Sequence, residues 1–285
     1  MLEQIETIGA LRQWLDARPS HDKRRRVGLV PTMGALHAGH AELIRHARRE
    51  CDAVVVSIFV NPLQFDRPDD LARYPRTLDA DLALCRDLGV DAVFTPAASE
   101  IYREAPECTV HVGRLADHLC GKYRPGHFRG VATVVLKLFQ IVHPERAYFG
   151  EKDAQQVAII RRMVTDFNIP VAIVEVPTVR EADGLAMSSR NWHLSKAERA
   201  AAPALYRALL DVQRKVLAGE RDAVALKSAA AAAIPHPDML KIEYFDIVDP
   251  HSLQPVDRID GPVRAAGAMW VGSTRLIDTV LIPWP

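Results

Sequence analysis

The chain has 285 residues, a length that fits one large or two modest domains, and 48% of the residues are hydrophobic against 25% charged. These proportions are ordinary for a globular protein and exclude an intrinsically disordered chain. Lys and Arg together number 36, as do Asp and Glu, so there is no global basic field to attract a polyanion. We therefore expect no nucleic acid as the main partner.

The N-terminal segment lacks the apolar core and small-residue cleavage site of a secretory signal, and no run of about 18 apolar residues occurs. We expect no membrane-spanning segment and a cytoplasmic location. The four cysteines include no CxxC pair. This spacing predicts reduced, buried thiols rather than a disulfide framework or a zinc site.

Apolar positions at helical spacing predict a first amphipathic helix within residues 1–20. The charge run 23–26 then precedes a short apolar strand at 27–30, and we interpret that run as a solvated connector rather than a nucleic-acid patch. A continuous β-branched run at 53–60 predicts a strand covered on both faces. Further strands are predicted at 92–94, 147–149 and 171–174, separated by helical segments at 78–88, 131–142 and 155–167.

This alternation of strands and helices predicts parallel βαβ units in a doubly wound sheet, where ligands gather at the carboxyl ends of the strands. From about residue 195, two Ala-rich helical stretches at 196–217 and 223–233 lead into strand-like segments at 241–248, 263–271 and 275–282. We therefore predict an α/β fold with a Rossmann-like domain over 1–180 and a smaller α+β domain over 181–285.

The strongest motif, PTMGALHAGH at 31–40, directly follows the first predicted strand of the sheet. His37 and His40 are three residues apart where the turn passes into a predicted helix at 41–49, so they share one face. The N-terminus of that helix favours phosphate, and Gly34 and Gly39 permit close backbone approach. A Walker A loop and a GxGxxG loop are both absent from the sequence. The pair predicts a triphosphate site, with a zinc site as the alternative.

Three further segments place polar side chains at predicted strand ends or loops. Asn61 and Gln64 follow the strand at 53–60 and suit the hydroxyl and carboxylate of a small polar acid, although turn capping is an alternative for Asn61. Lys152, between a strand and a helix, supplies a point charge for phosphate, unless it belongs to a solvated turn. Arg124 stands in the loop RPGH, where it either meets a substrate carboxylate or is solvated.

The segment MSSR at 187–190 offers two hydroxyls and a guanidinium, or else a helix N-cap and a linker. The element TxGxLHxGH resembles the HxGH signature of the nucleotidyltransferase superfamily, which includes class I aminoacyl-tRNA synthetases. MSSR resembles the KMSKS-like loop of that superfamily, which closes over the triphosphate.

Further segments make the resemblance more specific. They are, in chain order, SIFVNPLQF at 57–65, YPRT at 74–77, RPGHFRGV at 124–131, FGEKDAQQ at 149–156 and VREADGLAMSSRN at 179–191. Together with the histidine motif they are similar to the pantothenate synthetase family over about residues 25–195.

The resemblance implies a ligase that condenses (R)-pantoate with β-alanine through a pantoyl-adenylate, using ATP and releasing AMP and diphosphate. It implies Mg²⁺ held mainly by the phosphates of ATP, with no protein metal site, and it implies a homodimer. The remaining alternatives are an adenylyltransferase without an amine step and a non-catalytic nucleotide- or metal-binding module. A tRNA synthetase is disfavoured, because the chain has no basic anticodon-binding extension.

The resemblance also assigns residues to roles. It places ATP against Met33, Gly34, Ala35, Leu36, His37, Ala38, Gly39, His40, Gly150, Glu151, Lys152, Asp153, Val179, Met187, Ser188, Ser189 and Arg190. It places the substrates against Gln64, Gln156, Asn61 and Arg124, and we expect His40, His37, Lys152, Ser188, Ser189 and Arg190 to be the catalytic groups.

Overall fold

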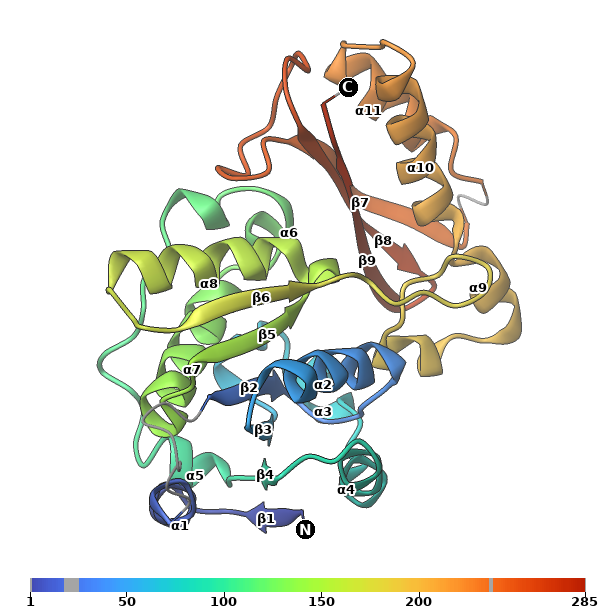
Figure 1. Cartoon of the computed structure of the whole chain (residues 1–285). Coiled ribbons are helices and arrows are strands. Elements are labelled where there is room, and N and C mark those ends of the chain that lie inside the picture. The colour runs from blue at the N-terminus through green and yellow to red at the C-terminus, as the bar shows by residue number, and fades with distance from the viewer. Residues whose placement is uncertain (1, 18–25, 236–237, 285) are drawn as a thin grey trace. The chain divides into compact units, whose positions relative to one another are not determined.

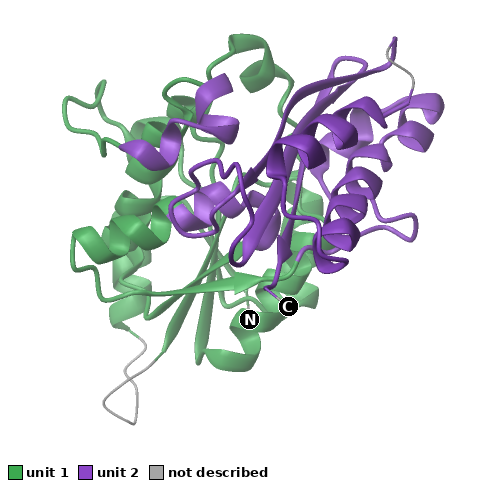
Figure 2. Ribbon diagram, turned by 90° about the horizontal axis from the view of Figure 1, so that it is seen from above, with its two compact units in different colours: residues 1–112, 124–150, 159–177 green, residues 113–123, 151–158, 178–285 purple. Residues whose placement is uncertain are grey.

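A computed structural model describes residues 2–17, 26–235 and 238–284 of the chain. The basic residues 23–25 of the charge run lie outside these ranges. The described residues divide into two compact units, which Figure 2 colours green and purple. Unit 1 comprises residues 1–112, 124–150 and 159–177, and unit 2 comprises residues 113–123, 151–158 and 178–285. The second unit thus takes two short segments that the sequence placed in the first domain.

In the described part of unit 1, six parallel strands form one sheet in the order β1-β4-β3-β2-β5-β6 (Figure 1). The strands are β1 (Glu3–Ile5), β2 (Val27–Thr32), β3 (Ala53–Ile58), β4 (Ala92–Phe94), β5 (Arg146–Gly150) and β6 (Ala172–Val176). The order changes direction between β2 and β5, which is the mark of a doubly wound sheet. The predicted Rossmann-like fold class is confirmed.

The helices of unit 1 cover both faces of this sheet. They are α1 (Ile8–Asp16), α2 (Ala38–Glu50), α3 (Pro68–Arg73), α4 (Leu78–Asp87), α5 (Ala98–Ile101), α7 (His127–Val142) and most of α8 (Ala154–Asp166). Buried side chains of α2 and α4, among them Ile44 and Cys85, pack with Val54 and Val56 of β3. The intervening Val55, which is fully buried, points to the opposite face of the sheet, because successive side chains of a strand alternate. Burial on both faces explains the unbroken β-branched sequence of β3.

The prediction of one helix within residues 1–20 was only partly right. Residues 3–5 form the edge strand β1, which pairs in parallel with β4, and the helix begins after Thr7, whose side chain caps Ala10 N. The apolar residues of this segment have helical spacing, but Glu3–Ile5 form a strand because they pair with β4. Such tertiary contacts commonly override the local helix propensity of a short segment.

Unit 2 is an α+β unit built on an antiparallel sheet with the order β7-β8-β9. Its elements are η2 (Arg114–Ala116), α6 (Leu119–Tyr123), η3 (Glu151–Asp153), η4 (Ser189–His193), α9 (Lys196–Ala201), α10 (Ala204–Leu217), α11 (Ala223–Ala232), β7 (Leu240–Val248), β8 (Val263–Val271) and β9 (Thr274–Ile282). The predicted helix 196–217 is interrupted, because Pro203 cannot donate a backbone hydrogen bond and α10 starts directly after it.

Both faces of the unit 2 sheet are covered, which explains why segment 113–123 belongs to this unit. Leu209 of α10 packs in one cluster with Met269 of β8, whereas Ala268 packs with Leu119 of α6 in another. The side chain of Gln155 also donates to the carbonyls of Leu115 and His118, at 2.8 Å each. These contacts join residues 113–123 and 151–158 to the C-terminal sheet.

Two smaller predictions concern membrane-spanning helices and the cysteine thiols. No helix in the described ranges has the length and apolarity that a bilayer crossing requires. Cys51, Cys85 and Cys120 are buried as predicted, and burial raises the pKa of Cys85 to about 12. Cys108 is exposed, contrary to the prediction of four buried thiols, because it lies in an irregular segment after α5.

Candidate functional site

The histidine motif forms the connection between β2 and α2, at the carboxyl end of a central strand. Gly34 and Ala35 both adopt the left-handed conformation, with φ of 81° and 51°. A β-carbon at Gly34 would lie 2.9 Å from Asp81 Oδ2, so both its conformation and its surroundings require glycine. This tight turn brings the chain directly to His37, the residue that caps α2.

The two imidazoles lie against each other at the N-terminus of α2, with ring centroids 4.1 Å apart. The Nδ1 of His37 accepts the backbone N–H of Gly39 at 3.1 Å, and the Nδ1 of His40 accepts the N–H of His37 at 3.3 Å. The His37 side chain also caps the backbone of His40, and this contact and the bond from the His37 N–H to His40 form a capping box. Because each Nδ1 is an acceptor, a neutral ring carries its proton on Nε2, where it is a hydrogen-bond donor.

A network of amide hydrogen bonds surrounds the turn that follows β3. Buried Asn61 donates from Nδ2 to Gln64 Oε1 and to the carbonyl of Gly130, at 3.1 Å each. Its Oδ1 accepts the N–H of Leu63 at 3.3 Å and the hydroxyl of Tyr102 at 3.0 Å. The carboxamide of Asn61 is therefore fully used within the protein, and it orients Gln64 rather than presenting itself to a ligand.

Gln64 lies beside the histidine turn. Its Nε2 is 2.9 Å from the sulfur of Met33, the first residue of the candidate ATP segment. Because β2 and β3 are paired from Val27↔Ala53 to Thr32↔Ile58, the loops that follow them leave the same edge of the sheet. Unit 1 thus brings a candidate substrate residue together with the candidate nucleotide turn.

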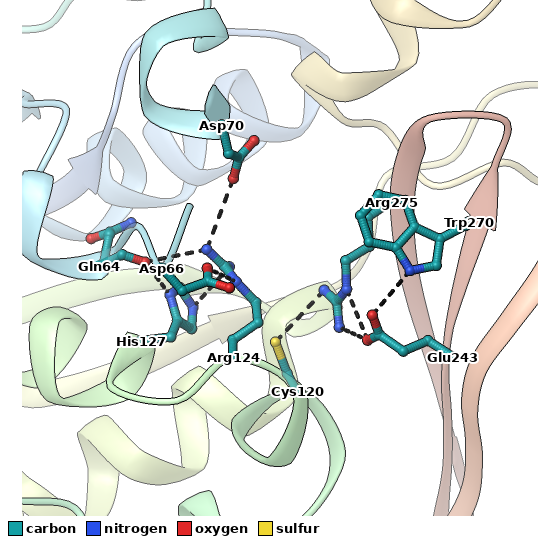
Figure 3. A network of polar contacts seen from close by, with 9 residues as sticks. All are labelled: Gln64, Asp66, Asp70, Cys120, Arg124, His127, Glu243, Trp270 and Arg275. Carbon is teal, nitrogen blue, oxygen red and sulfur yellow. Dashed lines mark hydrogen bonds and ion pairs between the residues drawn. The ribbon is translucent and has the colours of Figure 1, made fainter. Parts of the chain in front are cut away.

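Arg124 lies in a cluster of polar groups beside Gln64 (Figure 3). Its guanidinium contacts Asp66 Oδ1 at 2.9 Å and Asp70 at 3.9 Å, and it donates to the Gln64 carbonyl at 3.2 Å. His127 Nδ1 lies 2.7 Å from the same carbonyl. Burial opposes ionisation of Asp66, but the hydrogen bond and charge of Arg124 outweigh it and lower the pKa of that carboxyl. In this structure Arg124 is ion-paired and supports the backbone of Gln64.

β5 is paired with β2, so Gly150, the last residue of β5, lies at the same sheet edge as the histidine turn. The chain then enters unit 2 at η3, which contains Glu151, Lys152 and Asp153. Glu151 Oε1 lies 3.6 Å from the guanidinium of Arg264. Gln156 is half-buried in the first turn of α8, next to the buried Gln155 described above.

The remaining candidate residues belong to a hairpin of unit 2. The backbone of Met187 pairs with Val179, and Arg180 forms a β-bridge with Ala186. Ser188 caps η4 by accepting the N–H of Arg190 at 3.3 Å, and Ser189 is buried at the start of that helix. The N-cap that the sequence offered as the alternative for this segment is therefore observed at Ser188, and the hydroxyl proton of Ser188 is still a donor.

Arg180 secures this hairpin to the unit 2 sheet. It donates to both carboxylate oxygens of Asp278, at 2.6 and 2.9 Å, and its guanidinium lies 3.6 Å from the centre of the Tyr206 ring. A second ion pair of unit 2, between Arg275 and Glu243, lies beside Trp270, whose ring nitrogen donates to Glu243 at 3.1 Å (Figure 3). Both pairs are structural contacts of the sheet.

Three residues that hold candidate residues in place within their own unit escaped the sequence reasoning: Asp81 and Tyr102 in unit 1, and Arg180 in unit 2. Asp81 follows the YPRT segment, so its nearness to a recognised segment was an available signal. Tyr102 and Arg180 act on residues 41 and 98 positions away, and their partners follow from the tertiary fold alone.

The comparisons with known proteins agree with this architecture. The family model described as pantoate-beta-alanine ligase matches residues 3–281. A pantothenate synthetase of Thermotoga neapolitana is 50% identical over 278 residues, which cover 98% of this chain and 99% of the relative. Bifunctional pantoate ligase/cytidylate kinases are 54% identical over 259 residues, and there the chain spans about half the length of the relatives it matches.

Solved structures of relatives share the fold over nearly the whole chain. Pantothenate synthetase from Thermus thermophilus is 44% identical, with a TM-score of 0.92 and coverage of 99% of this chain and 100% of that one. Pantoate-beta-alanine ligase from Francisella tularensis, in complex with β-γ ATP and β-alanine, is 36% identical, with a TM-score of 0.79 and coverage of 99% and 98%. The chain belongs to the pantoate–β-alanine ligase family, the family of the pantothenate synthetases.

Proposed function

We propose that this protein condenses (R)-pantoate with β-alanine in two steps. In the first step, a carboxylate oxygen of pantoate attacks the α-phosphorus of ATP, and the bond to diphosphate breaks to leave pantoyl-adenylate. In the second, the amine of β-alanine attacks the acyl carbon, AMP leaves, and the nitrogen loses a proton. The reaction needs ATP because a free carboxylate is a poor acyl donor, whereas an acyl phosphate has a good leaving group.

One observation carries this proposal: the loops after β3, β2 and β5 leave one edge of the unit 1 sheet side by side. They bring Gln64, the paired imidazoles and Gly150 to the place where doubly wound sheets bind ligands. The Gln64–Met33 contact of 2.9 Å joins the amide loop to the histidine turn. The Francisella relative, which was solved with β-γ ATP and β-alanine, supports the same two ligands here.

The imidazoles of His37 and His40 donate from Nε2 to the phosphate oxygens on which negative charge develops as diphosphate leaves. Lys152, Ser188, Ser189 and Arg190 of unit 2 act on the same triphosphate through a point charge, two hydroxyls and a guanidinium. The backbone segments 33–40, 150–153, Val179 and Met187 hold the rest of ATP. These roles use positioning and electrostatic stabilisation, without a protein nucleophile.

Gln64 and Gln156 bind pantoate through their amides, and Gln64 also lies near the β-alanine position. Asn61 acts through Gln64, because both ends of its own carboxamide are engaged. Arg124 binds a substrate carboxylate, which takes the place of the Asp66 carboxylate as the ion-pair partner of the guanidinium. A guanidinium binds either carboxylate with the same geometry.

Mg²⁺ accompanies ATP in this proposal and neutralises the charge of the triphosphate. Within the described ranges, no group of three His, Cys, Asp or Glu side chains is arranged to hold a metal ion. Mg²⁺ prefers hard oxygen ligands, and in this proposal the phosphates of ATP supply most of them.

The adenylation step is tested by the exchange of labelled diphosphate into ATP. We expect exchange to depend on pantoate and to proceed without β-alanine, because the first step is reversible by itself. Release of AMP should then require β-alanine. An adenylyltransferase without an amine step would give the same AMP-containing product with and without β-alanine. A non-catalytic module would show no exchange with any acid, and either result would contradict the proposal.

Removing the Tyr102 hydroxyl should weaken pantoate binding indirectly. Burial raises the pKa of Tyr102 to about 12, so this hydroxyl remains a donor to Asn61 at neutral pH. Tyr102→Phe leaves one acceptor position of buried Asn61 unpaired, and we expect KM for pantoate to rise about three- to ten-fold, the effect of one hydrogen bond. KM for ATP should stay within about two-fold. Steady-state kinetics with each substrate varied in turn decides this, and an equal rise in both KM values would contradict it.

In this proposal the substrates are small molecules, the protein is cytoplasmic, and it forms a homodimer. The dimer is tested by sedimentation equilibrium at micromolar concentration, where a mass near twice the chain mass of 31.6 kDa is expected. A mass equal to that of one chain at all concentrations would exclude it.

A further inference from the structure

A buried carboxylate accepts hydrogen bonds from the backbone of the histidine turn. Asp81, in the first turns of α4, is only 3% exposed. Its Oδ2 accepts the N–H of Ala35 at 2.9 Å, and its Oδ1 accepts the N–H of Leu36 at 2.8 Å. Thr77 donates its hydroxyl to Oδ1 at 3.1 Å. One carboxylate thus binds two consecutive amides of a turn that lies 45 residues away in the sequence.

These two bonds stabilise a backbone that the chain does not adopt readily. Gly34 and Ala35 are consecutive residues with positive φ, and alanine in this region is strained by its β-carbon. Such a conformation persists only when the surrounding structure determines it. Asp81 holds the turn in this conformation, because a carboxylate forms stronger hydrogen bonds to backbone N–H groups than a neutral acceptor does.

The direction of this turn sets the position of the imidazoles. Leu36 is followed immediately by His37, which caps α2, and His40 bonds back to the His37 amide. A displacement of residues 34–36 therefore moves both rings, and Asp81 bonds the backbone of Ala35 and Leu36 within this segment. Both oxygens of Asp81 accept from protein groups, so the carboxylate acts through the turn rather than on a ligand.

We propose that Asp81 is a positioning residue for the reaction: by binding Ala35 and Leu36 it holds His37 and His40 where they stabilise the leaving phosphates. The inference rests on the proposed adenylation step. It predicts a loss in the maximal rate rather than in ATP binding, since the imidazoles act on charge that develops in the transition state.

The test is Asp81→Asn, which keeps the shape of the side chain and replaces one acceptor oxygen with an NH₂ that cannot accept from the turn. We expect the maximal rate of pantoate-dependent diphosphate exchange to fall about 100-fold, the scale of a misplacement of about 1 Å. Half-saturation by ATP should change less than about three-fold, because ground-state contacts to ATP remain. Long-range ¹H–¹⁵N NMR of the imidazoles should show the Nε2–H tautomer in the parent protein and a mixture in the variant.

Asp91→Asn is the matched control. Asp91 also binds a backbone amide, that of Val54, at 2.8 Å, and it pairs with Arg48 at 2.7 Å. It lies before β4, at the opposite end of the strands from the histidine turn. This variant should lose comparable thermal stability while its exchange rate stays within about three-fold, because no candidate residue is supported by Asp91.

Thr77→Val is a milder variant that keeps the test valid should Asp81→Asn not fold. It removes one hydrogen bond to the carboxylate, and the exchange rate should fall about three- to ten-fold. A full exchange rate in Asp81→Asn, an equal loss in Asp91→Asn, or unchanged tautomers overturns the inference. If the parent protein itself shows no pantoate-dependent exchange, the proposed function fails instead, and the NMR comparison still measures whether Asp81 positions the rings.

Discussion

Replacing His40 with alanine should lower turnover about 100- to 1000-fold, the usual loss when one preorganised donor to a developing oxyanion is removed. His40 Nε2 is a donor because its Nδ1 accepts the His37 amide, and its ring lies against that of His37. KM for ATP should change much less than turnover, because the interaction strengthens as charge moves onto the leaving diphosphate. Single-turnover measurement of diphosphate release isolates this step.

His40 also stabilises α2, so the loss of the capping box has to be separated from the loss of catalysis. The cap is worth about 1 kcal/mol, which urea unfolding measures. His40→Asn can restore the acceptor of the cap without placing a donor at the position of Nε2. We expect it to recover stability but not turnover. His46→Ala, further along α2 and bonded to the Glu42 carbonyl, should leave turnover unchanged. Recovery of turnover in His40→Asn would show that His40 contributes only through the helix cap.

Gly130→Ala should reduce kcat/KM for pantoate about 100-fold through a displaced turn. A β-carbon at Gly130 would lie 2.6 Å from the nitrogen of Gln64 and nearer still to the Leu63 carbonyl. Both neighbours are backbone atoms, so the turn that contains Gln64 must move, and the bond from Asn61 to the Gly130 carbonyl moves with it. Overpacking of this kind also destabilises a fold by about 1–3 kcal/mol.

Gly9→Ala is the control for Gly130→Ala. Within the described ranges, a β-carbon at Gly9 of α1 would meet no atom within 4 Å beyond its own helix and chain neighbours. This change should raise helix stability by up to about 1 kcal/mol and leave the kinetics unchanged. The two variants add the same methyl group, so they separate the packing of the Gln64 turn from any general effect of glycine substitution. Unchanged pantoate kinetics in Gly130→Ala would show that this packing does not position Gln64.

The central strands and the main helices were predictable from the sequence because their patterns are long and buried. The run 53–60 contains β3, and the position of the histidine motif at the carboxyl end of β2 was also predicted, although its first two residues belong to the strand. The edge strand β1 was not, because three residues carry too little pattern to reveal a partner 89 positions away at Ala92. The break at Pro203 was visible in the sequence and should have divided the helix predicted over 196–217.

For the candidate site, the sequence identified the motifs but not the contacts that position them. For Asn61 the sequence predicted a substrate contact or a turn cap, and the cap is observed at Leu63; its bonds to Tyr102 and Gly130 involve partners that only the folded chain brings near. Arg124 was considered as a loop residue and is ion-paired with Asp66. A motif shows which residues a turn contains. Whether their side chains are already hydrogen-bonded within the protein depends on residues from distant segments.

The attachments of the hairpin 179–187 have a mechanical consequence. Arg180 is bonded to Asp278 of β9 and stacked on Tyr206 of α10, and Asn191 reaches back to Glu181 at 2.9 Å. Arg199 of α9 also pairs with Glu181 and with Asp183 at 2.6 Å. These contacts fix the hairpin that carries Ser188, Ser189 and Arg190 to β9, α9 and α10 of unit 2. A swing of these three residues on their own would require several charged contacts to break at once, so they travel together with the strand and helices to which the hairpin is fastened.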